Sequence, residues 1–156
     1  EYKSLRGIEF PSISAPIDLH AAQARIAAAR NRLYHASLLG EMKRERRADV
    51  DASIRTILDF DNRVVAPHNG FKDALDYYRQ SSAGPLLGAI RRPALIIHAA
   101  DDPWIPIAAY RAAPWSANSN LLPHLTASGG HVGFHAAGLT MPWHDAALLR
   151  LLEAVR

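Results

Sequence analysis

The residues after Pro93 read Ala94-Leu95-Ile96-Ile97-His98-Ala99, and the acidic loop Asp101-Asp102-Pro103-Trp104-Ile105-Pro106 follows one residue later. A short, largely apolar run of this kind is typical of a parallel strand that is buried on both faces. We interpret His98, which interrupts the apolar run, as a core residue. The segment therefore predicts an α/β sheet in which a polar loop follows a buried strand.

Two other segments have the features of strands. Phe10-Pro11-Ser12-Ile13-Ser14-Ala15-Pro16 is short and closed by proline, and Asn120-Leu121-Leu122-Pro123-His124-Leu125-Thr126 precedes the glycine-rich loop Gly129-Gly130-His131-Val132-Gly133-Phe134. Pro123 cannot donate a hydrogen bond to a sheet, which suggests an edge position for the last strand. Because helical segments separate the three strands, we expect a parallel α/β sheet.

Helical periodicity is clearest between the first and second strands. Apolar residues from Leu19 to about Leu39 recur at spacings of three and four, Asp18 is placed to cap this helix, and Gly40 to end or bend it. Further amphipathic segments predict helices from about Val50 to Phe60, from Gly70 to Arg79 and from Met141 to Val155, with a loop over 64–70.

Composition narrows the class of protein. With 156 residues, 49% of them hydrophobic, the chain has the size and apolar content of one globular domain. It contains no cysteine, which excludes disulfides and thiolate chemistry. The net charge of +3, with one basic run at Lys43-Arg44-Glu45-Arg46-Arg47, indicates a solvated helix face and no nucleic-acid partner. No apolar run is long enough to span a membrane, so we expect a soluble, cytoplasmic protein.

Asp102 and His131 are the candidate site residues. Each lies in a loop that follows a predicted strand, and the His loop comes about thirty residues after the acidic loop, in the order of the acid and base of a Ser-Asp-His triad. A carboxylate that accepts the imidazole N–H fixes the tautomer of the histidine and stabilises the imidazolium. Asp101 is a rival for the role of the acid, and either aspartate could instead cap a turn.

Metal binding is an alternative role for His131, because His135 lies four residues further on. Gly133 between them argues against a helix, and Val132 stands where a zinc protease carries Glu, so we expect neither a metal nor a cofactor. Aromatic residues near the two loops are expected to pack beneath them: Trp104, Phe134 and Trp143. Five other histidines are expected at surface or lid positions: His20, His35, His68, His124 and His144.

Several further motifs accompany the two loops. Ser14-Ala15-Pro16-Ile17-Asp18-Leu19, Phe60-Asp61, Ala66-Pro67-His68-Asn69-Gly70-Phe71 and Asp76-Tyr77-Tyr78 precede them, and Trp143 follows. With these motifs the chain resembles, over nearly its whole length, the C-terminal half of the YheT-like family of α/β-hydrolase fold serine hydrolases. In this resemblance Asp102 matches the triad acid and His131 the triad base. It implies one partial domain over 1–156, with about three parallel strands, flanking helices and a helical lid-like insertion over 18–90 between the first two strands.

The resemblance also implies an activity, that of a carboxylesterase or lipid-ester hydrolase acting on a small-molecule or lipid ester. No Gly-x-Ser-x-Gly occurs in the chain, and the family pattern places the nucleophile elbow and the oxyanion hole before Glu1. We therefore expect a fragment that is inactive alone and pairs with a complementary N-terminal half. The alternative is a non-catalytic binding or oligomerisation module that self-associates through the exposed edge of the first strand, at 13–15.

Overall fold

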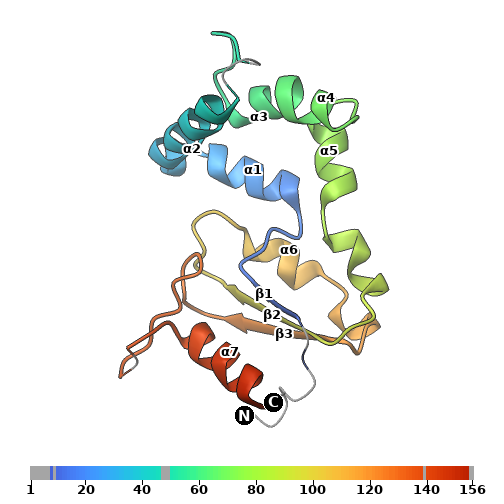
Figure 1. The fold of residues 1–156 in the computed structure, drawn as a ribbon, viewed down its shortest axis with the longest axis vertical. Coiled ribbons are helices and arrows are strands. Elements are labelled where there is room, and N and C mark those ends of the chain that lie inside the picture. The colour runs from blue at the N-terminus through green and yellow to red at the C-terminus, as the bar shows by residue number, and fades with distance from the viewer. Residues whose placement is uncertain (1–7, 9, 47–49, 139, 155–156) are drawn as a thin grey trace. The chain divides into compact units, whose positions relative to one another are not determined.

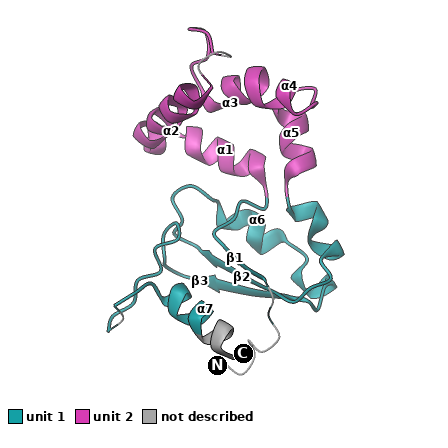
Figure 2. Cartoon of the chain, viewed as in Figure 1, with its two compact units in different colours: residues 1–17, 83–156 teal, residues 18–82 magenta. Residues whose placement is uncertain are grey.

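The structure, a computed structural model, describes residues 8, 10–46, 50–138 and 140–154, with side chains up to Leu149 in the last helix. The chain divides into two compact units (Figure 2): residues 1–17 and 83–156 form one, here called the sheet unit, and residues 18–82 form the other, the helical unit. Both candidate site residues belong to the sheet unit.

The sheet unit contains a three-stranded parallel sheet (Figure 1), which confirms the predicted α/β class. Its strands are β1 (Phe10–Ile13), β2 (Ala94–Ala99) and β3 (Leu121–Thr126), in the order β1-β2-β3. Every residue of β2 is buried, as the apolar run predicts for a strand covered on both faces. In this sheet β3 is an edge strand, in agreement with the position of Pro123.

The other edge of the described sheet is β1. The N–H groups of Phe10 and Ser14 donate to carbonyl groups of the β2 segment at 3.3 and 2.9 Å. Backbone groups alternate in direction along a strand, so those of Pro11 and Ile13 face the outer edge. Because Pro11 has no N–H, the only donor that β1 can offer at this outer edge is the Ile13 N–H.

Helices flank the sheet. In Figure 1, α6 (Ile107–Ala112) and α7 (Trp143–Ala154) lie on opposite sides of it, and 3-10 helices span Gly84–Ala89 and Trp115–Ala117. One buried core of the unit joins β2 to the His loop, and its members are Ile8, Leu95, Ile97, Ala99 and Phe134. The sheet and the His loop are therefore packed into the same core.

The helical unit consists of short helices around a second apolar core (Figure 2). Asp18 caps its first helix as predicted, since its Oδ1 accepts the Ala21 N–H at 2.9 Å. The helical elements are α1 (Leu19–Ala27), a 3-10 turn (Ala29–Asn31), α2 (Arg32–Glu45), α3 (Ile57–Phe60), a π-helix (Asp61–Val65), α4 (Ala66–His68) and α5 (Ala74–Ser81). The core residues are Leu39, Ile54, Ile57, Phe60 and Val64.

The prediction of one helix from Leu19 to about Leu39 is wrong. The helix ends at Ala27 because Ala28 is extended, and the Asn31 side-chain amide donates to the Arg25 carbonyl at 2.9 Å, which satisfies one of the free carbonyl groups at the end of α1. A new helix, α2, starts at Arg32 and runs through Gly40, where the sequence predicts an end or bend. Leu33 is 80% exposed, so the apolar stripe does not continue past the break.

The prediction of a loop over 64–70 is also wrong. The chain stays helical from α3 through the π-helix and α4. This helical run ends at Asn69 and Gly70, and Gly70 has a φ of +76°. Pro67 is the second residue of α4, directly after the π-helix, so the proline does not end the helical run. In contrast, residues 50–55 are not helical, and α3 begins at Ile57 after its N-cap, Thr56, which forms a capping box with Asp59.

The chain closes on itself where it leaves and re-enters the sheet unit. The Gly84 N–H donates to the Ile17 carbonyl at 2.8 Å, and a Cβ at Gly84 would lie 3.0 Å from that oxygen. Within the helical unit the Leu19 N–H donates to the Ser82 hydroxyl at 3.0 Å. Each unit thus has its two chain ends held together by its own hydrogen bond.

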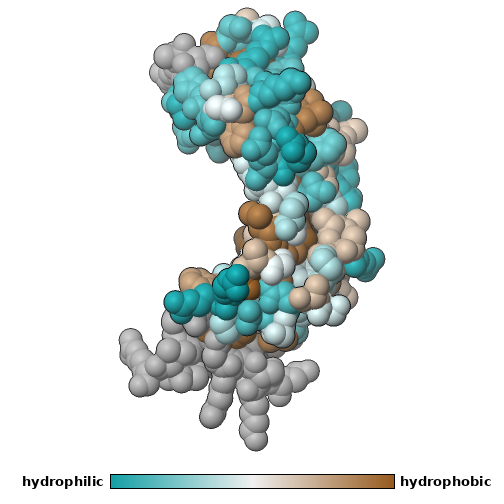
Figure 3. Space-filling model, turned by 90° about the vertical axis from the view of Figure 1, so that its right-hand side faces the viewer, coloured by the Kyte–Doolittle hydropathy of each residue, from teal (hydrophilic) through white to brown (hydrophobic). Residues whose placement is uncertain are grey.

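Figure 3 shows one face of the helical unit at the top of the view. This face is mainly hydrophilic, with apolar residues interspersed among polar ones. The largest exposed apolar side chains of the helical unit are Leu33 and Leu75. Among the described residues, every helix falls short of the length and apolarity that a membrane crossing requires.

Candidate active site

Asp102 lies in the turn after β2, and its side chain is fully buried. Its Oδ1 accepts the backbone N–H groups of Trp104 at 2.8 Å and Ile105 at 2.9 Å. An aspartate that bonds the backbone two and three residues further on forms an Asx turn, which fixes the carboxylate plane. The second oxygen, Oδ2, is thereby directed away from the turn and toward the His loop.

His131 lies in the loop after β3, and its Nδ1 is 2.9 Å from Asp102 Oδ2. A carboxylate oxygen accepts, so Nδ1 carries the ring proton and Nε2 keeps its lone pair in the neutral ring. The His131 side chain is 26% exposed, whereas that of Asp102 is not exposed at all. The pair therefore presents a basic nitrogen near the surface and keeps its carboxylate in the interior.

Asp101 has a different partner. Its Oδ1 accepts the Gly130 backbone N–H at 2.8 Å, and the residue is exposed. Asp101 thus ties the acidic loop to the His loop through the backbone, while Asp102 contacts the imidazole. Of the two candidate acids, the structure brings Asp102 to His131.

The His loop has an unusual backbone. Val132 and Phe134 have positive φ angles of 55° and 41°, a conformation that side chains other than glycine rarely adopt. Two glycines are required by close approach: a Cβ at Gly129 would lie 2.5 Å from the Phe134 ring, and one at Gly133 would lie 2.8 Å from the Gly129 carbonyl. Strain of this kind persists only where the surroundings hold it in place.

Ser14 supplies part of those surroundings. It follows β1, is buried, and has a φ of 49°. Its hydroxyl accepts the Val132 N–H at 3.4 Å, so the loops after all three strands meet at the pair. This contact has no sequence signal, because it joins residues from opposite ends of the chain.

His98 and Tyr110 lie beneath the acid. His98 is fully buried, which confirms its assignment to the core, and its Nε2 is 3.2 Å from the Ile105 carbonyl. Burial lowers the pKa of His98, although the negative charge of Asp102 opposes that shift. Burial, aided by the Asp102 charge, raises the pKa of Tyr110 to about 12, so both rings are neutral at pH 7.

Each of the three aromatic residues near the loops contacts a neighbouring ring or the core. Trp104 meets the His131 ring edge-on, with ring centroids 4.7 Å apart, and Trp143 stacks on His124 at 4.8 Å. Phe134 is buried in the core of the sheet unit. The surface position predicted for His144 is wrong, because this residue is buried against the Phe134 ring at a centroid distance of 5.2 Å.

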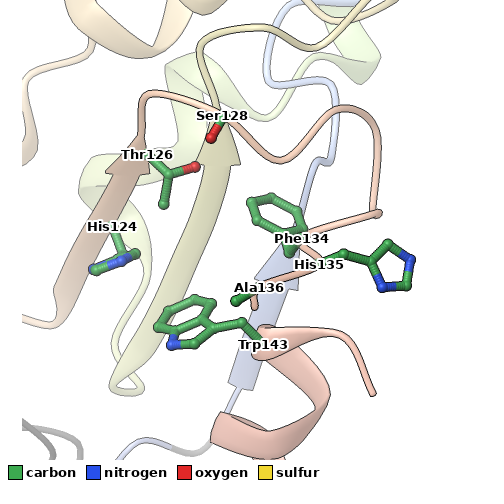
Figure 4. A pocket seen from close by; sticks show the side chains of 7 residues that line it. All are labelled: His124, Thr126, Ser128, Phe134, His135, Ala136 and Trp143. Atoms are coloured by element: carbon green, nitrogen blue, oxygen red, sulfur yellow. The ribbon is translucent and has the colours of Figure 1, made fainter. Parts of the chain in front are cut away.

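A separate cavity of about 330 Å³ lies beside β3 and the start of α7 (Figure 4). Neither Asp102 nor His131 is among its lining residues. The side chains that line it are His124, Thr126, Ser128, Phe134, His135, Ala136 and Trp143. His135, the residue considered as a second metal ligand, is among the lining residues, and its ring points away from the other labelled side chains in Figure 4, while the His131 ring bonds Asp102.

The fold and the pair together define a class of protein. Three parallel strands with flanking helices, and an Asp–His contact formed by the loops at their carboxyl ends, are features of the α/β-hydrolase fold. In that class the order of acid and then base along the chain is the order found here.

Comparison with known proteins identifies the family. YheT of Escherichia coli is 36% identical over 143 residues, which are 83% of this chain and 42% of that protein. An abhydrolase domain-containing protein of Dictyostelium discoideum is 29% identical over 155 residues, 91% of this chain and 39% of that protein. The monoacylglycerol lipase of Saccharomyces cerevisiae is 35% identical over 104 residues, 64% of this chain and 22% of that protein.

The chain belongs to the YheT-like family of α/β-hydrolase fold proteins. It spans less than half the length of each of these relatives. No protein-family model matches it.

Proposed function

We propose that this chain supplies the acid, Asp102, and the base, His131, of a serine hydrolase that acts on carboxylic esters. The observation that carries the proposal is the 2.9 Å contact between His131 Nδ1 and the buried Oδ2 of Asp102. The relative named monoacylglycerol lipase supports an ester of lipid type as the substrate. A small carboxylic ester is the alternative within the same reaction class.

The geometry supports a two-step reaction. His131 Nε2 takes the proton of a serine hydroxyl as that oxygen attacks the ester carbonyl, and Asp102 stabilises the resulting imidazolium. His131 then gives the proton to the departing alkoxide, which leaves an acyl-enzyme and a free alcohol. In the second step Nε2 takes a proton from water as the water oxygen attacks the acyl carbonyl. His131 then returns this proton to the serine oxygen as the acyl C–O bond breaks, which releases the carboxylic acid and regenerates the serine hydroxyl.

The serine is proposed to come from outside these 156 residues. Three serines have a described hydroxyl contact: Ser14 with the Val132 N–H, Ser53 with Asp51 and Arg63, and Ser82 with the Leu19 N–H and the Tyr78 carbonyl. The chain has no Gly-x-Ser-x-Gly turn to expose a nucleophile and to form an oxyanion hole. We propose that the outer edge of β1 pairs with the rest of the hydrolase sheet and that the helical unit acts as a lid.

A chimaera tests the proposal. This chain would replace the aligned segment of the Escherichia coli relative, and the product would be assayed with a short p-nitrophenyl ester and a fluorophosphonate probe. We expect hydrolysis and serine labelling by the chimaera, and neither above background by the chain alone, because loss of one triad member costs several powers of ten in rate. The unmodified relative sets the reference rate.

Two outcomes would contradict the proposal. Ester hydrolysis by the pure 156-residue chain would show that the nucleophile lies within it. A chimaera that folds but neither labels nor hydrolyses, beside an active reference, would favour a non-catalytic binding module. The observation behind that second candidate is the outer edge of β1, with which no strand among the described residues pairs.

A further inference from the structure

His98 is a fully buried histidine whose ring faces the acid of the pair. It lies in β2, and its Nδ1 is 3.9 Å from Asp102 Oδ2. Neither side chain of this contact is exposed. Histidine in a buried strand most often fills space, so a role at the site must be argued from its two ring nitrogens.

The contact on one nitrogen decides the state of the other. Nε2 lies 3.2 Å from the Ile105 carbonyl, which can only accept, so Nε2 carries a proton. A neutral imidazole has one N–H, and burial lowers the pKa of His98, which keeps the ring neutral. Nδ1 therefore has no proton, and within the described residues it has no hydrogen-bond partner.

Because His98 Nδ1 carries no proton, His98 cannot donate a hydrogen bond to Asp102 Oδ2. Asp102 Oδ1 is occupied by the N–H groups of Trp104 and Ile105. Asp102 Oδ2 has His131 at 2.9 Å and the lone pair of His98 at 3.9 Å. A His98 with its proton on Nδ1 would instead be a competing donor to Oδ2 and would leave the Ile105 carbonyl without its partner.

The ring is held in this orientation from one side. Tyr110 stacks on it with ring centroids 4.0 Å apart and an angle of 8° between the planes. Tyr110 in turn donates its hydroxyl to the Ala15 carbonyl, next to Ser14, and its own carbonyl accepts the Trp115 ring N–H at 2.7 Å. The stack thus fixes the plane of the His98 ring beneath the acid.

We infer that His98 is a positioning residue for the pair. As the neutral Nε2–H tautomer it holds the acidic loop through the Ile105 carbonyl and reserves Asp102 Oδ2 for His131. This inference rests on the proposed function only in treating Asp102 and His131 as catalytic.

The test uses nitrogen NMR of the full 156-residue chain with labelled histidines, near neutral pH. Ring nitrogen shifts should report Nε2–H for His98 and Nδ1–H for His131. In His98→Phe, which keeps an aromatic ring beside Tyr110 but removes both nitrogens, the His131 Nδ1 proton should exchange with water about tenfold faster. The faster exchange would follow from the loss of the His98 bond to the Ile105 carbonyl, because Ile105 in turn holds the Asp102 carboxylate through its N–H.

Tyr110→Phe is the matched control. It keeps the stack on His98 and removes only the hydroxyl contact to Ala15, so both tautomers and the His131 exchange rate should stay as in the parent chain. If His98 only filled space in the core, the exchange rate of the His131 Nδ1 proton would be the same in His98→Phe and in Tyr110→Phe.

Three results would overturn the inference: an Nδ1–H tautomer of His98, a cationic His98 ring, or a His131 exchange rate unchanged in a folded His98→Phe chain. The tautomer is measured in the parent chain, so the test stands even if the Phe variant does not fold. None of these measurements needs ester hydrolysis. An inactive chimaera with the expected NMR signals would therefore count against the proposed function alone.

Discussion

Asp101 and Asp102 are neighbours in sequence with different partners in the structure. Asp101 accepts a backbone N–H from the His loop, and Asp102 accepts the ring N–H of His131. The division arises from the turn, because the N–H groups of Trp104 and Ile105 fix the Asp102 carboxylate and direct its free oxygen to the ring. One aspartate therefore positions the loop, and the other sets the tautomer of His131.

Replacing each aspartate by asparagine in the active chimaera should separate these roles. Asp102→Asn should lower kcat by about 10³- to 10⁴-fold, because an amide that donates to Nδ1 favours the wrong tautomer of His131. Asp101→Asn keeps an oxygen that can accept the Gly130 N–H, so it should cost about tenfold or less. Initial rates with a p-nitrophenyl ester measure both. Equal losses in the two variants would contradict the assignment of Asp102 as the acid.

At the scale of single residues, the sequence predicts that an aspartate and a histidine lie close together, but it does not predict every contact around them. The pairing of an acidic loop with a His loop follows from the strand pattern, and the structure brings Asp102 and His131 together. The loop alone left the choice between Asp101 and Asp102 open, since either could cap the turn, and it was the family resemblance that assigned the role of the acid to Asp102. The contact from Ser14 depends on which strands lie next to each other in the sheet, and the position of His98 beside Asp102 depends on how the turn after β2 folds back, and neither can be read from the local sequence pattern.

At the scale of elements, alanine content misled the helix prediction. Ala22 is buried in α1, whereas Ala29 and Ala36 are exposed, so counting each alanine as apolar extended the stripe beyond its true end. The buried strand β2 was easier to predict, because a six-residue run that is apolar except for His98 has few alternatives once it is bounded by proline and an acidic loop. The π-helix over Asp61–Val65 has no sequence signature of its own.

That π-helix begins at a buried carboxylate. Asp61 accepts the hydroxyl hydrogen bond of Tyr78 from α5, and burial raises the pKa of Asp61 although this bond opposes the shift. An acid whose folded pKa is raised binds more protons in the folded than in the unfolded state. Its contribution to the free energy of unfolding is fully present below its ordinary pKa of 3.8 and is lost as the pH rises through the folded pKa.

Asp61→Asn should remove this pH dependence. The free energy of unfolding of the parent chain minus that of the variant should fall as the pH rises from about 4, by at most about 1.4 kcal/mol per pH unit, and then level off. Urea denaturation at a series of pH values measures the difference.

Asp59→Asn is the control of opposite sign. Hydrogen bonds from Arg55 and Thr56 lower the pKa of Asp59, so its contribution is present above the ordinary pKa and is lost as the pH falls through the folded value. The parent-minus-variant difference should therefore rise with pH for Asp59. A flat difference for Asp61, beside the expected rise for Asp59, would count against a raised pKa at the π-helix.

At the scale of the molecule, the candidate pair depends on one unit only. The described hydrogen bonds of Asp102 and His131 all lie within the sheet unit, and that unit closes where the Gly84 N–H meets the Ile17 carbonyl. The parallel sheet, its order of elements and the long helical segment between β1 and β2 follow from the sequence. The division into two units does not, because it depends on which helices pack together.

Deleting residues 18–82 and joining Ile17 to Ala83 through a short Gly-Ser linker should leave the sheet unit folded. We expect one cooperative thermal transition and a retained His131 Nδ1 proton signal, since chain closure costs little when the ends are already in contact. Calorimetry and proton NMR measure both. Gly84→Ala in the shortened chain should lower the transition temperature, because its Cβ would crowd the Ile17 carbonyl.

Loss of the His131 signal in the shortened chain, or a Gly84→Ala substitution without effect there, would contradict this account of the sheet unit. The first result would mean that the helical unit is needed to form the pair. The second would mean that the closure at Ile17 is dispensable.

The closure at Ile17 and Gly84 has an evolutionary consequence. Since the entropy of closing a loop grows only by about 0.6 kcal/mol for each doubling of its length, a segment anchored by touching ends can lengthen, shrink or be exchanged with little penalty to the sheet. The helical unit is then a segment that can be exchanged while the sheet unit stays unchanged. Members of the family could diversify it by insertion and deletion while the loops that carry Asp102 and His131 stay the same.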